Sequence, residues 1–213
     1  MLEVKDLVAG YGGKAVVRVP SMSAGPGQAQ LLLGPSGSGK STVLLAMAGL
    51  ADIMKGTVSI AGVELSRLSS AERDRSRGRM IGFIFQDLHL VPGLSALDNL
   101  MLSPFAAGVG QDRERALSLL ASLGVGDKAL RPAERLSRGE AQRIAIARAM
   151  LLKPSLILAD EPTASLDDAA CESVASLLEQ AAADTGASLI IATHDSRLKA
   201  RFALATAVEP VHE

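Results

Sequence analysis

The sequence of 213 residues has few aromatic residues and no excess of positive charge. Four Phe, one Tyr and no Trp leave few rings on which nucleic-acid bases could stack. The 22 Lys and Arg residues are balanced by 23 Asp and Glu, and the formal net charge of -1 gives no support for a basic, nucleic-acid-binding surface. We therefore expect no nucleic-acid partner.

The chain also lacks the features of secreted and membrane-spanning proteins. Its only cysteine, Cys171, cannot form an internal disulfide bond, which is typical of a reducing compartment. Apolar stretches such as 43–50 are far shorter than the roughly 18 residues that a spanning helix needs. Residues 1–6 have neither the basic nor the apolar region of a signal peptide. These observations predict a cytoplasmic protein, long enough for one α/β domain with a small inserted subdomain.

Short apolar runs, each ending at a polar residue or glycine, predict the strands of a central sheet. The runs are 31–33, 81–85, 156–159 and 189–193, and they lead to Gly34, Gln86, Asp160 and His194. Continuous hydrophobicity is typical of strands buried on both faces, as in a parallel sheet covered by helices. Because ligands bind at the carboxyl ends of such strands, these four positions are expected to converge.

The remaining segments predict helices and a few antiparallel strands. Helical patterns cover 42–50, 113–123, 140–152 and 168–183. Residues 87–153 show no strand pattern, which predicts an inserted helical subdomain within a single domain over 1–213. Antiparallel strands are expected at 2–8, 16–23 and 56–61. The predicted fold is α/β, with a mainly parallel sheet, an N-terminal antiparallel β subdomain and the helical insertion.

A phosphate-binding loop directly follows the first apolar run. It consists of Gly34, Pro35, Ser36, Gly37, Ser38, Gly39, Lys40, Ser41 and Thr42. Glycines let successive backbone N–H groups turn inward around phosphate oxygens, and the following helix adds its positive end. Lys40 is expected to reach the β- and γ-phosphates, Ser41 to coordinate Mg²⁺ and Thr42 to lie near the α-phosphate. The alternative, a glycine-rich turn that carries a lysine by chance, is disfavoured by the flanking strand and helix.

Two adjacent acids, Asp160 and Glu161, stand at the end of the run 156–159. Such acids can be plain surface residues, but the phosphate loop in the same chain favours a shared site. Asp160 is then suited to hold Mg²⁺, directly or through water. Glu161 is suited to polarise the water that attacks the γ-phosphate.

A third motif lies between the phosphate loop and the two acids, at residues 136–143, with the sequence Leu-Ser-Arg-Gly-Glu-Ala-Gln-Arg. Together the three motifs are typical of one family. In order and spacing, the set resembles the ATP-binding cassette (ABC) ATPases, whose signature is usually Leu-Ser-Gly-Gly-Gln. The resemblance covers essentially the whole chain and implies a P-loop NTPase core of the RecA-like type that binds and hydrolyses ATP. It also implies a head-to-tail dimer, either a homodimer or a pair with a related subunit. In that dimer Ser137, Gly139 and Glu140 serve the nucleotide of the opposite subunit.

Other positions take their expected roles from the same resemblance. Tyr11 matches the aromatic residue that stacks on adenine, although a Tyr before two glycines can simply mark a turn. Gln86 matches a glutamine that contacts Mg²⁺ or the attacking water. His194 matches a histidine that hydrogen-bonds the γ-phosphate, although a lone histidine at a strand end is usually structural. Asp167 matches a loop that crosses the dimer interface, and otherwise would be a helix N-terminal acid.

Arg138 stands where the first glycine of the signature is usual, whereas a glutamate at its last position, as in Glu140, is common in the family. It could add positive charge near the partner's γ-phosphate or disturb the close backbone approach there. We interpret Arg138 as a residue that tunes the rate of ATP turnover. Arg138→Gly is therefore expected to leave ATP binding intact and to change turnover less than about tenfold.

The expected partner is an integral membrane permease, since the resemblance implies a transporter ATPase. The apolar segment 87–94 is placed where the family grips its permease, although it could instead be a core-facing hinge. Four segments, 82–86, 97–100, 136–143 and 159–163, look most like the lipoprotein-release and macrolide-export branch. The chain would then lie at the cytoplasmic face of the inner membrane. The alternatives are a soluble ABC ATPase for protein assembly or repair, and a nucleotide sensor that never hydrolyses, against which Glu161 argues.

Overall fold

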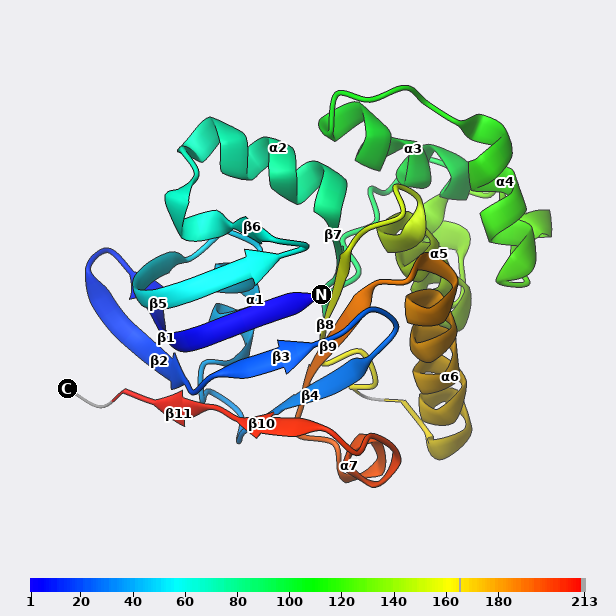
Figure 1. Cartoon of the computed structure of the whole chain (residues 1–213). Coiled ribbons are helices and arrows are strands. Elements are labelled where there is room, and N and C mark those ends of the chain that lie inside the picture. The colour runs from blue at the N-terminus through cyan, green and yellow to red at the C-terminus, as the bar shows by residue number, and fades with distance from the viewer. Residues whose placement is uncertain (165, 212–213) are drawn as a thin grey trace.

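The computed structural model describes residues 1–164 and 166–211, and these form two sheets that lie side by side (Figure 1). One sheet is mainly antiparallel, in the order β11-β2-β1-β5-β6 with β3 paired to β1. Its strands are β1 (Leu2–Tyr11), β2 (Lys14–Val19), β3 (Met22–Ala24), β5 (Asp52–Ile60), β6 (Val63–Glu64) and β11 (Glu209–Pro210). The other sheet is parallel, in the order β10-β4-β9-β8-β7. Its strands are β4 (Ala29–Leu33), β7 (Ile81–Ile84), β8 (Leu156–Asp160), β9 (Ser188–Thr193) and β10 (Ala205–Ala207).

One helix packs between the sheets, a group of helices covers the other face of the parallel sheet, and α2 (Ser70–Met80) lies apart from both, near β6 (Figure 1). The α-helices are α1 (Lys40–Met47), α2 (Ser70–Met80), α3 (Ala96–Ala106), α4 (Arg113–Ser122), α5 (Arg138–Met150), α6 (Asp168–Thr185) and α7 (Ser196–Arg201). Short 3₁₀ turns cover Leu65–Arg67, Gly126–Lys128 and Ala133–Arg135. Helix α1 packs between the two sheets, whereas α3, α4 and α5 occupy the chain between β7 and β8. No described helix is long and apolar enough to cross a membrane.

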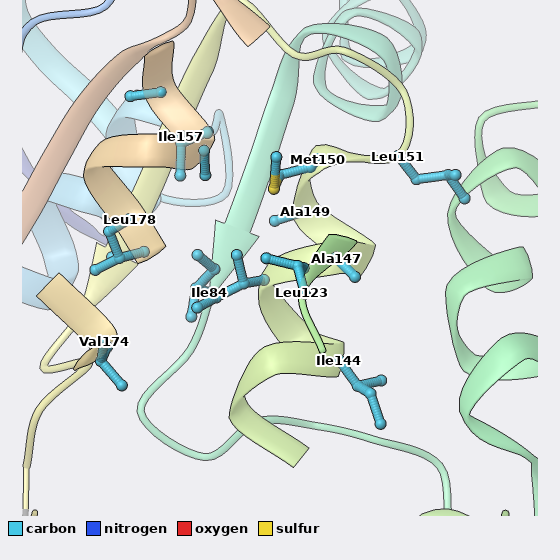
Figure 2. Close-up of a cluster of buried hydrophobic side chains, with 14 of the residues drawn as sticks. Ile84, Leu123, Ile144, Ala147, Ala149, Met150, Leu151, Ile157, Val174 and Leu178 are labelled. Carbon is cyan, nitrogen blue, oxygen red and sulfur yellow. The ribbon is translucent and has the colours of Figure 1, made fainter. Parts of the chain in front are cut away.

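The parallel strands are buried on both faces, which explains their continuous hydrophobicity. In β8, Leu156 and Leu158 face the cluster that contains α1 and the antiparallel sheet. Ile157 and Ala159 face the opposite cluster, which contains α5 and α6. Figure 2 shows Ile157 in that second cluster, near Leu178 of α6. Successive side chains of a strand point to opposite faces, so one apolar run serves two cores.

The expected α/β fold with a mainly parallel sheet is confirmed, and the expected strand ends fall at β4, β7, β8 and β9. The expectation of a single strand over 16–23 is wrong, because β2 ends at Val19 and β3 begins at Met22. Pro20 lies between them, and a proline has no N–H to donate to a ladder. Residues 87–153, all of them described, hold helices and only one isolated bridge, between Ser95 and Pro132. Their separation as a subdomain stays a prediction.

Helix α2 is the main element that the sequence analysis did not predict. It has no buried residue, so its sequence carries no apolar stripe to reveal it. Its start is fixed instead by a capping box, in which the Ser69 hydroxyl accepts from Glu72 N and the Glu72 carboxylate accepts from Ser69 N at 2.9 Å. The Ser-x-x-Glu spacing was the available signal.

Candidate nucleotide-binding site

The register of the parallel sheet brings the predicted residues to one edge. Leu33 of β4 pairs with Thr193 of β9, and Asp160 of β8 pairs with Ala192 of β9. The chain therefore leaves three neighbouring strands at the same level, directly before the phosphate loop, Glu161 and His194. Parallel strands all end at the same edge, which is why residues far apart in sequence meet there.

The phosphate loop adopts the backbone that its glycines predict. Gly39, the residue before α1, has φ +93°, and Gly37 has φ +77°. A Cβ at Gly39 would lie 2.7 Å from the Val17 side chain, so a larger residue would meet both strain and a clash. The hydroxyl of Ser38 is buried and has no hydrogen-bond partner in the described part of the chain. A loop of this shape presents backbone N–H groups to an anion.

Lys40 folds back over this loop. Its Nζ donates to Gly34 O at 3.0 Å and to Pro35 O at 3.1 Å, and lies 3.2 Å from Glu161 Oε1. The side chain is only 6% exposed, so the ammonium is fixed at the mouth of the loop rather than free in solvent. Phosphate oxygens bound in the loop would compete with Glu161 for this ammonium.

Glu161 is held in a strained but well-supported position. Its φ of +43° lies in the left-handed region, which a residue with a Cβ rarely adopts. Its backbone N–H donates to Ala192 O at 2.9 Å. Its carboxylate lies 2.8 Å from His194 Nδ1 and accepts from Thr193 Oγ1 at 3.3 Å. Lys40, Glu161 and His194 thus form one contiguous cluster of polar side chains.

A pocket of about 320 Å³ opens beside this cluster. The predicted residues that line it are Ser36, Gly37, Gly39, Lys40, Ser41, Thr42, Gln86, Glu161 and His194. Val16 and Ala164 line it as well. The sequence analysis missed these two, because neither carries a polar group that would mark it as functional.

Asp160 lies at the end of β8, directly before Glu161, and is shielded from solvent. Its Oδ1 is buried without a hydrogen-bond partner among the described residues. Burial raises the pKa of the Asp160 carboxyl, the neighbouring Glu161 charge raises it further, and the Ser41 hydroxyl and Lys40 charge act against both. An unpartnered oxygen of this kind is suited to a cation or its bound water.

Other predicted residues are not brought to this pocket. Tyr11 lies at the end of β1, where it is 46% exposed and precedes the turn at Gly12 and Gly13. Ser137, Gly139 and Glu140 lie at the start of α5 and do not line the pocket. That they serve the nucleotide of an opposite subunit stays a prediction.

The start of α5 is closed by a capping box. The Ser137 hydroxyl accepts from Glu140 N at 3.3 Å, and the Glu140 carboxylate accepts from Ser137 N at 2.8 Å. These hydrogen bonds explain why α5 begins at Arg138, two residues before the expected start at Glu140. Since the Ser137 hydroxyl is used as an acceptor here, its proton is available to a ligand.

A second network, which the sequence analysis missed, lies next to the pocket around Asp195 and Arg197. Arg197 donates to Asp195 Oδ2 at 2.8 Å, to Asp168 Oδ1 at 2.8 Å and to Leu166 O at 3.1 Å. The Thr163 hydroxyl donates to the same Asp195 oxygen at 2.9 Å. Hydrogen bonding to Arg197 holds the pKa of the Asp195 carboxyl well below its usual range. In the sequence, only the position of Arg197, three residues after the predicted His194, could have indicated that it lies near the site.

Asp167 caps the start of α6, where its carboxylate accepts from Ala170 N at 2.8 Å. This is the helix-terminal role that the sequence left open beside an interface role. Within the described residues, no three His, Cys, Asp or Glu side chains cluster as a metal site of their own.

Comparison with known proteins decides the family. A family model described as ABC transporter matches residues 17–164. The chain belongs to the ABC transporter family. One relative of this ABC cassette, "Lipoprotein-releasing system ATP-binding protein LolD 2" of Rhodospirillum rubrum, is 39% identical over 94% of this chain and 90% of its own length. Another, "Lipoprotein-releasing system ATP-binding protein LolD" of a Ruegeria species, is 42% identical over 92% of this chain and 88% of its own length.

Solved structures agree with this assignment. The cassette is similar to a dimeric post-hydrolysis state of the ATP-binding cassette MJ0796 bound to ADP and Pi, with a TM-score of 0.83 and 30% identity over 98% of this chain and 94% of that one. It is also similar to cbiO1 of Clostridium perfringens, part of an ABC transporter complex, with a TM-score of 0.85 and 25% identity over 99% of this chain and 86% of that one. The ABC ATPase fold is therefore shown across nearly the whole chain.

Proposed function

We propose that this chain binds ATP with Mg²⁺, hydrolyses it in a head-to-tail dimer and drives a membrane permease from the cytoplasmic face of the inner membrane. The observation that carries the proposal is the cluster of Lys40, Glu161 and His194 at the mouth of the phosphate loop. In it, Lys40 holds phosphate oxygens, Glu161 orients and polarises the attacking water, and His194 donates to the γ-phosphate.

The residues around Asp160 fit a magnesium ion held together with the triphosphate. Asp160 has an unpartnered buried oxygen, and Ser41 and Gln86 add oxygen donors, the type that Mg²⁺ prefers. When bound, the ion would neutralise part of the phosphate charge. Tyr11 is exposed at the end of β1, where its ring is free to stack on adenine.

The dimer is supported by the exposed start of α5 and by the dimeric form of a similar cassette. Ser137 can donate its hydroxyl proton, and the N-terminal end of α5 carries the positive end of the helix dipole. Both features favour the γ-phosphate of a nucleotide bound to a second copy of the chain or to a related subunit.

Docking of a permease is supported by an apolar groove of about 330 Å³. It is bordered by α1, α2, β7, α3 and α5, and its lining includes Leu50, Phe85 and Ala106. Leu50 is 48% exposed, so apolar surface faces solvent at the rim. We assign this groove to a short cytoplasmic segment of the permease. The names of the relatives, which belong to lipoprotein-releasing systems, support transport work of the mechanical type.

The segment 87–94 lines a separate hollow next to Gln86, and its backbone groups form hydrogen bonds with side chains of α3 and α5. Buried Asn99 accepts from Val91 N at 2.7 Å, and Arg148 donates to Leu88 O and to His89 O. Leu90 packs partly against the helical core, whereas Val91 is 42% exposed. We propose that the segment transmits permease contact to Gln86, which directly precedes it.

The test is recovery of the tagged chain from detergent-solubilised membranes, together with phosphate release by the recovered complex. We expect a membrane permease to copurify with wild type and with Leu130→Glu, an exposed position outside the groove. Ala106→Glu, which places a charge in the groove, should lose the permease and keep ATP binding. Recovery with a soluble partner only would support assembly or repair instead, and a complex that binds ATP without releasing phosphate would support a sensor.

A further inference from the structure

Arg138, the departure from the usual signature, makes a contact within its own chain. It is the first residue of α5, directly after the capping residue Ser137. Its Nη2 donates to Ala164 O at 3.0 Å. Ala164 lines the nucleotide pocket together with Lys40 and Glu161. The arginine therefore reaches from the signature turn to the rim of the pocket in the same subunit, a contact that a glycine at this position could not make.

The contact is not explained by helix stability. A positive side chain in the first turn of a helix faces the positive end of the helix dipole, which is locally unfavourable. Arg138 is exposed and packs against no core cluster. Removing its side chain should therefore leave the fold intact.

A second arginine donates a hydrogen bond to the same loop. Arg197, in the helix that follows His194, donates to Leu166 O at 3.1 Å. Two carbonyls of the loop between β8 and α6 thus accept hydrogen bonds from arginines of two different helices. One of these helices carries the signature, and the other follows the predicted γ-phosphate contact. Both arginines therefore hold described residues of this loop.

We propose that Arg138 is a positioning residue that links the signature turn to the rim of its own nucleotide pocket. The proposal rests on the proposed dimer, in which the signature turn serves the partner's nucleotide. Arg138 and Ala164 connect the two: when nucleotide binding shifts the rim of one pocket, the signature turn moves with it. That turn contacts the nucleotide bound to the other subunit. The link therefore couples the two composite sites, and coupling between sites appears as cooperativity in ATP concentration.

The first measurement is hydrogen exchange of the isolated chain without nucleotide, which needs no dimer. The amides to follow are Ala164 N and Leu166 N, which donate within the loop to Glu161 O at 3.1 Å and Thr163 O at 3.2 Å. Arg138→Ala is expected to speed their exchange. Arg135→Ala removes the same charge from an exposed side chain nearby and should not change it.

The second measurement is the rate of phosphate release against ATP concentration. We expect the wild-type and Arg135→Ala Hill coefficients to exceed 1, and that of Arg138→Ala to fall to about 1, while kcat changes less than about tenfold. Arg138→Lys keeps a long donor and should restore both loop protection and cooperativity in part.

The outcomes separate this proposal from the proposed function. Equal exchange in Arg138→Ala and Arg135→Ala, or a wild-type Hill coefficient of about 1, overturns the link. So does a Lys variant that restores cooperativity without loop protection, because it would assign the effect to charge on the partner's phosphate. Failure of Glu161→Gln to dimerise with ATP counts against the proposed function instead. The exchange measurement still tests the link in that case, because it uses the isolated chain without nucleotide.

Discussion

The sharpest test of the site is Glu161→Gln, because this change keeps the shape of the side chain and removes its charge and basicity. Glu161 Oε1 lies 2.8 Å from His194 Nδ1 and 3.2 Å from Lys40 Nζ. Loss of a positioned general base typically costs about 10²–10⁴ in rate. We therefore expect phosphate release at saturating ATP and Mg²⁺ to fall by about 100-fold to 10,000-fold.

ATP binding should survive the same substitution, for an electrostatic reason. At a separation of 3.2 Å, the attraction between Lys40 and Glu161 is of the order of 5 kcal/mol at an effective dielectric constant of about 20, before desolvation is counted. Phosphate oxygens must replace this attraction when they bind Lys40. Gln removes it, together with the repulsion between the carboxylate and the γ-phosphate. Affinity for ATP should therefore stay the same or rise.

The assay combines phosphate release, binding of a fluorescent ATP analogue and sedimentation with ATP. Glu209→Gln removes a carboxylate that does not line the pocket and serves as the matched control. Glu161→Gln should bind ATP and sediment as a dimer without turning ATP over. Turnover within about threefold of wild type would refute the assignment of water activation to Glu161. Loss of ATP binding would refute the electrostatic argument.

Three further substitutions test other contacts. Lys40→Ala should weaken ATP binding at least about tenfold by fluorescence titration, since it removes the buried ammonium at the loop; unchanged affinity would contradict this. Asn99→Ala should lower the free energy of unfolding in urea by about 2–4 kcal/mol. The reason is that fully buried Asn99 accepts from Val91 N and donates to three backbone carbonyls. A loss as small as that of an exposed control substitution would count against this explanation. Asp195→Asn should lower Tm at pH 7 and lose this deficit as pH falls. The folded pKa of Asp195 is depressed, so its contribution is present above the unfolded pKa of about 3.9 and disappears as pH falls through the folded pKa. A Tm deficit that is independent of pH would contradict the ion-pair explanation.

The sequence predicted best what depends on contiguous residues. The phosphate loop and the acids at 160 and 161 each lie in a short segment whose chemistry is complete without distant contacts. Their convergence followed from one further rule, that parallel strands end at a common edge. The sheet register, with Leu33 beside Thr193 and Asp160 beside Ala192, bears out this expectation.

Contacts that depend on side-chain reach or unusual backbone were beyond sequence reasoning. The positive φ of Glu161 gives no sign in the sequence, because glutamate normally avoids that region. The hydrogen bond from Arg138 to Ala164 O joins residues 26 positions apart and requires the final packing of α5 against the loop. Helix α2 was missed because a helix without a buried face lacks the apolar period by which helices are recognised.

The position of Glu161 between Lys40 and His194 also bears on when water can be activated. Glu161 Oε1 lies 3.2 Å from Lys40 Nζ and 2.8 Å from His194 Nδ1. Under the proposed function, triphosphate oxygens compete with this carboxylate for the Lys40 ammonium. Glu161 then keeps its contacts to His194 and Thr193, which fix its orientation, while the oxygen that faced Lys40 loses one partner and can accept a hydrogen bond from the attacking water. Binding of the triphosphate therefore frees the acceptor position that the attacking water needs.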